Sequence, residues 1–529
     1  MPQLQINQGP QDALLYDNSR SYFTNVGYVR TSNFQLELRD VDPQNSANFG
    51  STVQFVIPKA ADLLGPVDLM LDLNKVSAVD SGAGYAAWVE SLGFAAIERI
   101  TFSVGSHDIE EITGDMLNIM NELMTKDEQR MGLRQILKTG RAAVAGNAGS
   151  STSSSMKAIV DTNTDYDNTQ RLLHSTDGTE FDGKKLIIPL GLFFTKHPSQ
   201  YFPLAAIAGC NDVRIAVKFR TLNELLLLRG TPTVANGVVT DVAETQVSTP
   251  TFASGTPIAR CQLRCHYVHV TGPEATTLMN KEHVRLLKLW HANPKPITLA
   301  STSAGTKFNV PIDLSFLHPV QSLVITIRKT SEMSSSLDNT AKPKSYNQGA
   351  KTKNYYAYHG GGKDPNIDSM KNSITGDVAQ PNLYESYIKV EDFKLSLNGQ
   401  ERHPSLASSG LDRNYLMNRM MPMLHSSTKS VFSESAEGSA TVDSSVFDAK
   451  HLAEALDRKE IYVYPFSLNP EGANPSGAVN FSKVSHAKLN ISGVAYSTSD
   501  TPVDYQVDVY AVYYNWLQIK DGRALTSFA

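Results

Sequence analysis

The stretch that decides the fold runs from Ile461 to Ile491 and reads IYVYPFSLNPEGANPSGAVNFSKVSHAKLNI. Its start is rich in Tyr, Val and Phe, which favour β-strands, and at its end Leu489 and Ile491 alternate with polar residues. The loop between contains prolines, which have no N–H to give to a sheet. The stretch therefore predicts two strands of a β-protein joined by an elaborate loop.

The rest of the chain repeats the strand signal. Short alternating or apolar runs recur between clusters of Gly, Pro, Asn and Ser, which predicts an all-β protein of the sandwich or barrel class. Apolar residues at helical spacing mark three segments, 115–137, 276–290 and 448–456, which we interpret as connecting helices. Examples of the strand-like runs are FQLEL, STVQFVI, VDLMLDL, RITFSV, VRIAVKF, SLVITI, DFKLSL and YQVDVYAVYY.

Two halves of the chain share an ordered set of patterns. Val56–Leu73 and Val310–Ile327 both contain a proline, seven further residues and then Pro-Val, followed by an apolar run. Farther along, Ile97–Glu110 resembles Val390–His403, and a third, weaker pair matches KLIIPLGLFF to EIYVYPFSL, each with the segment that follows it. Because the pairs occur in one order, we infer a duplicated domain with different loop insertions.

The repeats and the composition divide the chain into four parts. We expect an N-terminal arm at 1–26, a first domain at 27–270, a linker at 271–284 and a second domain at 285–529. Three long segments interrupt the β pattern, at 142–165, 230–257 and 330–377. Loops of this length are uncommon unless they are functional or disordered, so we expect insertions that project from one end of the framework.

The composition narrows the class of protein. The 529 residues carry a net charge of −5 without a basic bias, so we expect no specific nucleic-acid binding. Three cysteines, Cys210, Cys261 and Cys265, are too few for a disulfide framework. The N-terminal sequence has no signal-peptide pattern, and no apolar run is long enough for a transmembrane helix, so we expect cytosolic synthesis and no membrane span.

The sequence lacks motifs for catalysis and metal binding. It contains no His-Glu-x-x-His helix and no Gly-x-Ser-x-Gly elbow. Cys261 and Cys265 would lie about 13 Å apart on one face of a strand, too far for a disulfide or one zinc ion. We interpret both as buried core thiols, and we expect His266 and His269 to face opposite sides. We therefore expect no enzyme, no cofactor and no metal site.

The loop of the opening stretch carries a long pattern, Phe-x-Leu-x-Pro-Glu, then Pro-Ser-Gly, then Asn-Phe-Ser. This pattern resembles the C-terminal signature of the major capsid proteins of nucleocytoplasmic large DNA viruses, such as phycodnaviruses and iridoviruses. Segments including LHPVQSLVITI and LNGQER agree in family order, so the resemblance covers roughly residues 20–525. The signature residues are Phe466, Leu468, Pro470, Glu471, Pro475, Ser476, Gly477, Asn480, Phe481 and Ser482.

The resemblance implies a fold of two tandem eight-stranded jelly-rolls, a double jelly-roll, with a few short connecting helices and long loop insertions. It implies a structural major capsid protein whose homotrimers form pseudo-hexagonal capsomers that tile an icosahedral shell. The partners would be further copies, neighbouring capsomers and minor capsid proteins beneath the shell. The location would be the virion, after synthesis and assembly in the host cytoplasm.

The signature loop is expected to shape a contact within or between capsomers, because its prolines fix φ and its glycines permit tight bends. Two alternatives share the fold: a minor capsid paralogue, and a glycan-binding protein, for which Tyr355–Gly362 is the one aromatic cluster. An enzyme on a double β-sandwich would need reactive groups such as paired carboxylates converging in a cleft, and the sequence indicates no such set.

Overall fold

The computed structural model describes most of the β framework and leaves out the N-terminal arm and most of the three insertions. The described residues are 33–74, 76–78, 85–89, 91–125, 133, 136–137, 172–174, 185–209, 211–229, 232–235, 238–242, 251–252, 254–299, 306–330, 356, 386–402, 411–412, 461–470, 474–497 and 503–528.

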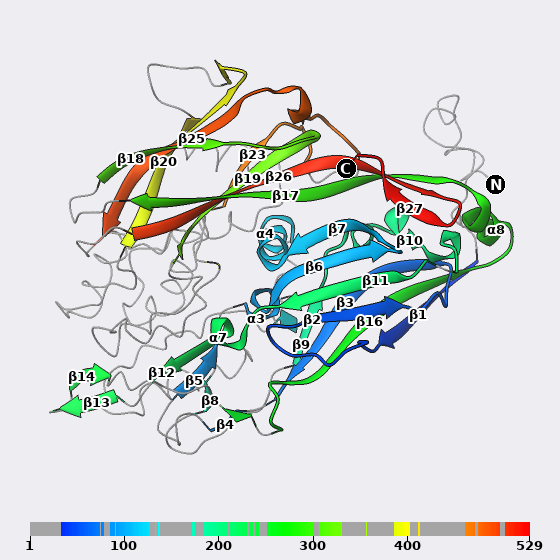
Figure 1. Ribbon diagram of the computed structural model, residues 1–529, viewed down its shortest axis with the longest axis horizontal. Coiled ribbons are helices and arrows are strands. Elements are labelled where there is room, and N and C mark those ends of the chain that lie inside the picture. Colours follow the sequence, from blue (N-terminus) through cyan, green and yellow to red (C-terminus); the bar gives the residue numbers. More distant parts are fainter. Residues whose placement is uncertain are drawn as a thin grey trace, which may run out of the picture.

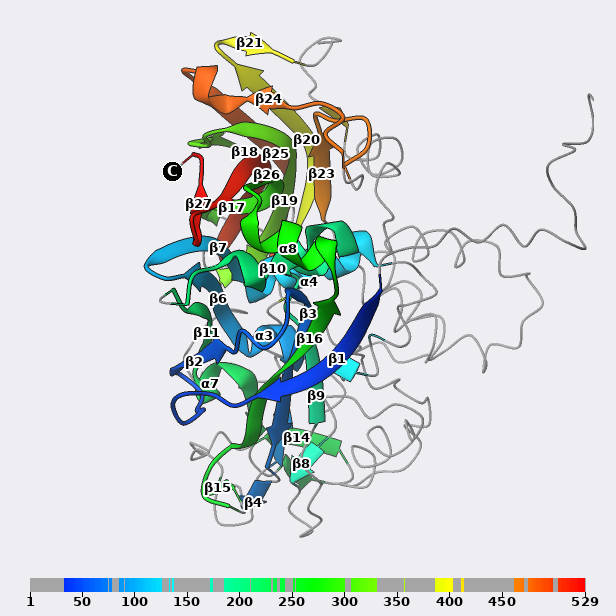
Figure 2. The ribbon, with the colours of Figure 1, turned by 90° about the vertical axis from the view of Figure 1, so that its right-hand side faces the viewer.

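The first half of the chain forms two antiparallel sheets that pack face to face (Figures 1 and 2). One sheet has the order β1-β16-β3-β10, with β9 also paired to β3, and the other has the order β2-β11-β6-β7. Their bounds are β1 Phe34–Val41, β16 Ile258–Val270, β3 Leu63–Leu73, β10 Phe202–Pro203, β9 Lys185–Pro189, β2 Thr52–Ile57, β11 Val213–Phe219, β6 Ile97–Val104 and β7 His107–Thr113.

The second half forms two further antiparallel sheets. One has the order β17-β26-β19-β23, with β24 beside β19 and β27 beside β26, and the other has the order β18-β25-β20-β21, with β22 beside β20. Their bounds are β17 His283–Leu299, β26 Val503–Lys520, β19 Pro319–Lys329, β23 Tyr462–Pro465, β24 Val479–Asn480, β27 Arg523–Thr526, β18 Thr306–Asp313, β25 Ala487–Ser497, β20 Ser386–Leu397, β21 Gln400–Glu401 and β22 Leu411–Asp412.

The two halves have the same strand topology. In each half, the first strand (β1 or β17) pairs with the last long strand (β16 or β26), which in turn pairs with the third strand of the half (β3 or β19). The facing sheets also correspond, with β2-β11-β6-β7 in one half and β18-β25-β20-β21 in the other. This arrangement is a jelly-roll, a double sheet with four strands on the main path of each sheet, and it occurs twice, with one further strand in the first half and three in the second. The repeated Pro-x7-Pro-Val pattern spans β2–β3 in one half and β18–β19 in the other, and the second pair spans β6–β7 and β20–β21. The duplication inferred from the sequence is confirmed.

Smaller elements decorate this framework. Among the described residues, the helical elements with defined bounds are α3 Leu92–Ala95, α4 Gly114–Met124, α7 Leu222–Leu225 and α8 Pro273–Asn280, and the short 3₁₀ turns are η2 Phe193–Thr195, η3 Pro198–Gln200, η4 Leu204–Ala206 and η8 Phe481–Lys483. The remaining strands are β4 Val76–Ala78, β5 Tyr85–Trp88, β8 Leu172–His174, β12 Leu226–Arg229, β13 Pro232–Ala235, β14 Val238–Val242 and β15 Thr251–Phe252.

One helix prediction was largely wrong. The segment 276–290 was expected to be helical, but α8 ends at Asn280 and the strand β17 begins at His283. The reason is tertiary, because β17 pairs with β26 along its whole length, from His283 opposite Ile519 to Leu299 opposite Val503. Of the helix expected at 115–137, the first part is present as α4, which ends at Met124 because Thr125 is extended, and most of the rest lies outside the described residues, as does the helix expected at 448–456.

Two hydrophobic cores hold the fold together. One lies between the two sheets of the second jelly-roll and includes Leu323, Phe393 and Val507. The other fills the first jelly-roll and continues across its boundary into side chains of the second, including Trp290 and Tyr510. The core of the first jelly-roll is therefore shared by both jelly-rolls, and this shared core fixes how they pack against each other.

Candidate functional site

The signature stretch begins as an edge strand of the second jelly-roll. Strand β23 pairs with β19, with Tyr462 opposite Ile325, and the N–H of Phe466 donates to the carbonyl of Gln321 at 2.8 Å. The structure describes every signature residue except Glu471, which lies outside the described residues. After Phe466 the chain leaves the sheet and turns back to β24, so the signature connects two strands that both pair with β19.

The two ends of the signature loop are tied together by one serine. The hydroxyl of Ser476 accepts a hydrogen bond from the N–H of Asn469 at 2.9 Å and donates one to the Asn469 carbonyl at 3.1 Å. Farther in, the carbonyl of Pro470 accepts hydrogen bonds from Gln321 Nε2 and from Lys288 Nζ, the latter at 3.2 Å. The loop is thus fixed to two strands, β19 and β17.

Gly477 occupies a position that other residues cannot fill without strain. Its φ is +140°, and a Cβ atom there would lie 3.0 Å from the carbonyl oxygen of Phe466. On the opposite side of the loop, Pro470 is buried while Leu468 is 81% exposed. The two described ends of the loop are therefore held in place, and one of them presents an apolar side chain to solvent.

The last three signature residues hold a strained turn. The Asn480 side chain accepts from the N–H of Ser482 at 3.0 Å, and the Ser482 hydroxyl accepts from the N–H of His318 at 2.9 Å. His318 has a φ of +68°, an uncommon conformation for a residue with a side chain. Phe481 is buried against Phe316 and Phe466, with ring centroids 5.9 and 6.1 Å away. The signature therefore stabilises one end of the second core.

The second jelly-roll packs onto the first through the outer face of its β17–β26–β19–β23 sheet. Tyr510 and Val512 of β26, Val324 of β19, Val463 of β23 and Trp290 of β17 all belong to the core of the first jelly-roll. In Figure 1, β17 and β26 run directly above β7 and α4. This sheet is therefore buried on both faces, one against its own partner sheet and one against the first jelly-roll.

A cluster of four charged residues spans this interface. Arg328 of β19, which is 2% exposed, binds Asp508 of β26 at 2.5 Å and Asp115 of α4 at 3.1 Å. Asp115 also approaches Arg220 at 3.4 Å, and Gln506 donates to Asp508 at 2.7 Å. Burial raises the pKa of Asp115, but the charges of Arg328 and Arg220 and a hydrogen bond from Arg328 outweigh it and hold this pKa below 3.8.

Sequence reasoning missed this cluster. The available signal was a charge beside or within a strongly apolar run: Arg328, followed by Lys329, after VITI, and Asp508 within YQVDVYAV. Charged residues are seldom fully buried unless they are paired, so each charge indicated a partner. Identifying Asp115 as that partner requires the fold, because it lies far away in the chain.

A second buried carboxyl lies close to the same interface. Glu110 of β7 is 4% exposed and accepts a hydrogen bond from the N–H of Phe193 at 2.8 Å. Burial raises the pKa of Glu110 to about 7, although the charge of Lys196 and the Phe193 hydrogen bond act in the opposite direction. Glu110 also helps to raise the pKa of Tyr513, a residue of the second jelly-roll, after the larger effect of burial.

Two cysteines on strand β16 are buried core thiols, as the sequence predicted. Cys261 and Cys265 are both buried, and burial raises the pKa of each thiol to about 12, so both stay protonated. Cys210 lies outside the described residues. His266 approaches Asp68 at 3.7 Å and His269 approaches Glu37 at 2.7 Å, so each histidine has its own carboxylate.

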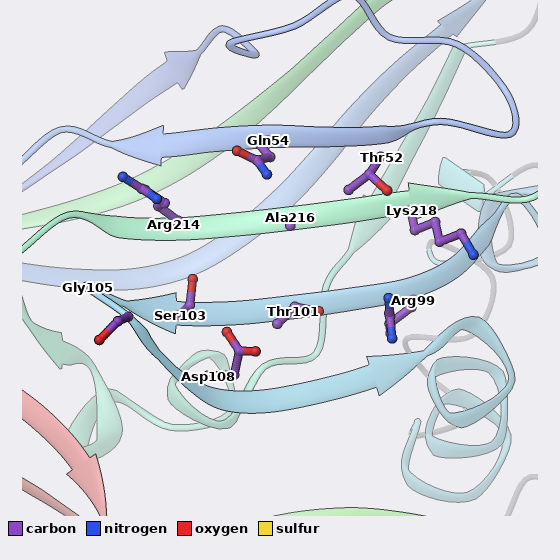
Figure 3. Close-up of a pocket in the computed structure, with 11 residues that line it drawn as sticks. Thr52, Gln54, Arg99, Thr101, Ser103, Gly105, Asp108, Arg214, Ala216 and Lys218 are labelled. Atoms are coloured by element: carbon purple, nitrogen blue, oxygen red, sulfur yellow. The ribbon is translucent and has the colours of Figure 1, made fainter.

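A shallow hollow of about 280 Å³ lies on the outer face of the β2–β11–β6–β7 sheet (Figure 3). Its floor is made of small polar side chains, including Thr52 and Thr101, with Lys218 and Arg99 at one end. Lys218 lies 2.6 Å from Glu98, and Arg99 lies 3.6 Å from Glu111. These charges are paired with their neighbours, which fits a solvated sheet face better than a ligand site.

In the described part of the chain, no helix has the length and apolarity to cross a membrane.

Sequence comparison relates the chain to viral major capsid proteins. Residues 21–269 match the family model of the major capsid protein N-terminus. The chain is 24% identical to the major capsid protein of Phaeocystis pouchetii virus, over 98% of this chain and 97% of that protein. It is 23% identical to the major capsid protein of Pyramimonas orientalis virus, over 98% of this chain and 96% of that protein.

Solved structures show the same architecture. The chain resembles the capsid of PBCV-1 with a TM-score of 0.61 and 18% identity, over 96% of this chain and 100% of that one. It resembles the Faustovirus major capsid protein with a TM-score of 0.56 and 14% identity, over 95% and 93% of the two chains. The fold is thus that of the double jelly-roll capsid proteins. Together with the sequence matches, it shows that the chain is similar over nearly its whole length to the major capsid proteins of these viruses.

Proposed function

We propose that this protein is the building block of a viral shell and that three copies form a pseudo-hexagonal capsomer. The observation that carries the proposal is the double jelly-roll, with both copies held in one orientation by a shared core and the Arg328 cluster. Three rigid pairs of similar domains give a block with six similar sides, and such blocks tile a surface.

The proposal assigns a structural role to each part of the chain. Residues 27–270 and 285–529 would be the two jelly-rolls, 271–284 the linker that contains α8, and 1–26 an arm that becomes ordered on assembly. The signature loop would shape a contact within or between capsomers, with Leu468 as its exposed apolar group. The neighbours would be other capsomers and minor capsid proteins beneath the shell, in a virion assembled in the host cytoplasm.

A structural role without catalysis is part of the proposal. The charged groups described above serve the packing between the jelly-rolls, since Arg328 contacts both Asp508 and Asp115 there. The net charge of −5 favours a shell subunit that does not bind nucleic acid through its phosphates.

The test is the mass of the purified protein by light scattering across a dilution series. A species near three times the chain mass of 57.9 kDa, unchanged on dilution, is the expected result for an obligate trimer. A monomer at every concentration, with the β-sheet spectrum intact, would contradict the proposed capsomer.

A further inference from the structure

The end of the sheet formed by β17, β26 and β27 is apolar on both of its faces. One face is buried in the core of the first jelly-roll through Leu517, Ile519 and Ala524. Side chains alternate between the two faces of a strand, so the residues between these point the opposite way. On that second face Val284, Trp516 and Leu525 are 58%, 43% and 43% exposed, and Leu286 is half-buried. We call these four residues of the second face the Trp516 patch.

The Trp516 patch is continuous across the three strands. Leu286 of β17 lies opposite Trp516 of β26, and Val284 lies opposite Gln518. On the other side of Gln518 lies Leu525 of β27. Opposite residues of antiparallel strands have their side chains next to each other on one face, so the apolar side chains of the patch adjoin. Single exposed apolar side chains are normal, but a contiguous apolar patch marks an interaction site.

The surroundings of the patch show where a partner would fit. Gln518 donates to Glu282, which also lies 3.8 Å from Lys520, so the polar groups at one end are paired with each other. At the other end, Lys288 donates to the carbonyl of Pro470 at 3.2 Å, so the signature loop reaches over the next row of side chains on this face. An apolar centre with a paired polar rim is the arrangement of a protein–protein contact.

The N-terminal segment, residues 1–32, joins the described chain at this end of the molecule. The carbonyl of Asn33 accepts a hydrogen bond from the hydroxyl of Thr271 at 3.4 Å, at the start of the linker that contains α8. From Thr271 the chain runs through α8 to Val284, and the rise of a helix and the length of extended residues limit this path to about 32 Å. In Figure 1, α8, the start of β17 and β27 lie at the same end of the molecule.

The composition of residues 1–32 matches the patch. The apolar run Ala13–Tyr16 ends 17 residues before Asn33, and an extended chain of that length spans up to about 56 Å, well beyond the path to Val284. The segment contains two aspartates, two arginines and no other charged side chain, so it brings no net charge to a rim that is already paired.

We propose that Ala13–Tyr16 pack on the Trp516 patch of the same chain. This packing would cover the apolar side chains that the described part of the chain leaves exposed, and the burial of apolar surface would order the segment. The packing needs one chain only, so it goes beyond the proposed trimer and does not depend on it.

The patch contains its own optical reporter. The chain has three tryptophans, and the other two, Trp88 and Trp290, are 0% and 7% exposed. Quenching of the tryptophan fluorescence by acrylamide therefore reports mainly whether Trp516 is covered.

The first test disturbs the segment rather than the sheet. Leu14→Asp together with Leu15→Asp should raise the acrylamide quenching and shift the emission to longer wavelengths, because the two charges would have to be buried without partners. Gln8→Asp together with Gln11→Asp adds the same charges to a polar part of the segment and should change neither. Adding Trp516→Phe to the first variant should remove the increase. Unchanged quenching in the first variant, or an increase that survives Trp516→Phe, would overturn the inference.

The second test identifies what covers the patch. A photo-activated phenylalanine analogue replaces Trp516, the purified protein is irradiated, and the cross-linked peptides are identified by mass spectrometry. Cross-links to residues 1–32 in a product of one chain mass, 57.9 kDa on a denaturing gel, are the expected result. A product of twice that mass, or cross-links only to the jelly-rolls, would overturn the inference. Light scattering of the same sample tests the trimer separately, because a monomer with the expected cross-links would contradict only the proposed capsomer.

Discussion

Arg328 of the second jelly-roll binds Asp115 of the first through both of its terminal nitrogens, with Nη1–Oδ1 at 3.1 Å and Nη2–Oδ2 at 3.2 Å. Such a two-pronged contact constrains direction as well as distance. Because Arg328 lies on a strand and Asp115 lies in the first turn of α4, the pair fixes the rotation of one jelly-roll relative to the other.

Removing this arginine is expected to destabilise the protein strongly. Arg328→Met removes the arginine that binds the buried Asp508 and leaves Asp115 with Arg220 alone, and breaking a buried pair in this way costs about 3–5 kcal/mol. Urea unfolding, followed by tryptophan fluorescence at one protein concentration, measures the loss. The matched control is Arg214→Met, which breaks an exposed pair with Asp212 and should cost less than about 1 kcal/mol. Equal losses in the two variants would refute the assigned role of the cluster.

The same cluster should contribute to stability only when Asp115 is ionised. Its pKa is below 3.8 in the folded chain, so the stabilisation is complete above the pKa of the unfolded chain and is lost as the pH falls through the lower folded value. The variant Asp115→Asn should therefore be less stable than the wild type at pH 7, and the gap should shrink below about pH 4. A gap that stays constant down to pH 2 would show that the charge of Asp115 has no part in the effect.

Glu110 should make the free energy of unfolding fall as the pH rises, which is the opposite of the effect of Asp115, and it should do so at higher pH. Its folded pKa of about 7 exceeds its ordinary value of 4.5, so the unfolded chain loses its proton first and stability falls as the pH rises from 4.5 to 7. Glu110→Gln removes this loss and should be more stable than wild type by roughly 3 kcal/mol at pH 8, with no gain at pH 4. Unfolding experiments at the two pH values check this, with Glu111→Gln, an exposed neighbour, as control. A gain that is the same at both pH values would contradict the titration of Glu110.

The signature loop should be sensitive to a single methyl group. Gly477→Ala meets both an unfavourable φ of +140° and the Phe466 carbonyl at 3.0 Å, with an expected cost of about 1–3 kcal/mol from the backbone alone. Gly399→Ala should lower the free energy of unfolding by only about 1 kcal/mol, because its φ of +77° is unfavourable for alanine but nothing lies within 4 Å of the added Cβ. Proteolysis of the loop and thermal unfolding compare the two. If Gly399→Ala proved the more damaging, the close approach at Gly477 would be irrelevant.

The sequence was sufficient for the features that are local in the chain. Strand periodicity located most of the long strands, and the repeated Pro-x7-Pro-Val pattern located the duplication, because each signal lies within about twenty residues. The buried state of Cys261 and Cys265 followed from their spacing on a single strand. The segment after Asn280 was ambiguous, because Leu286 and Leu289 have helical spacing whereas Leu287 and Leu289 alternate as on a strand, and only the pairing with β26 decides for a strand.

The contacts that hold the two jelly-rolls together could not be predicted in the same way. Arg328 lies 213 positions from Asp115 and 180 positions from Asp508, so no local pattern relates the three residues. The role of Ser482 in holding His318 likewise depends on an approach across 164 positions. Resemblance to the capsid family identified the signature residues, and the structure supplied what they contact.

The interface between the jelly-rolls also sets the order in which a newly made chain can be completed. Asp115 and Arg220 both belong to the first half, so this half of the charge cluster can form while the ribosome is still making the second. Asp508 and Tyr510 lie on β26, which ends at Lys520 and joins β17 to β19. Until β26 emerges, the apolar face that it covers stays open to water, and during that interval the nascent chain is exposed to aggregation and to the chaperones that prevent it.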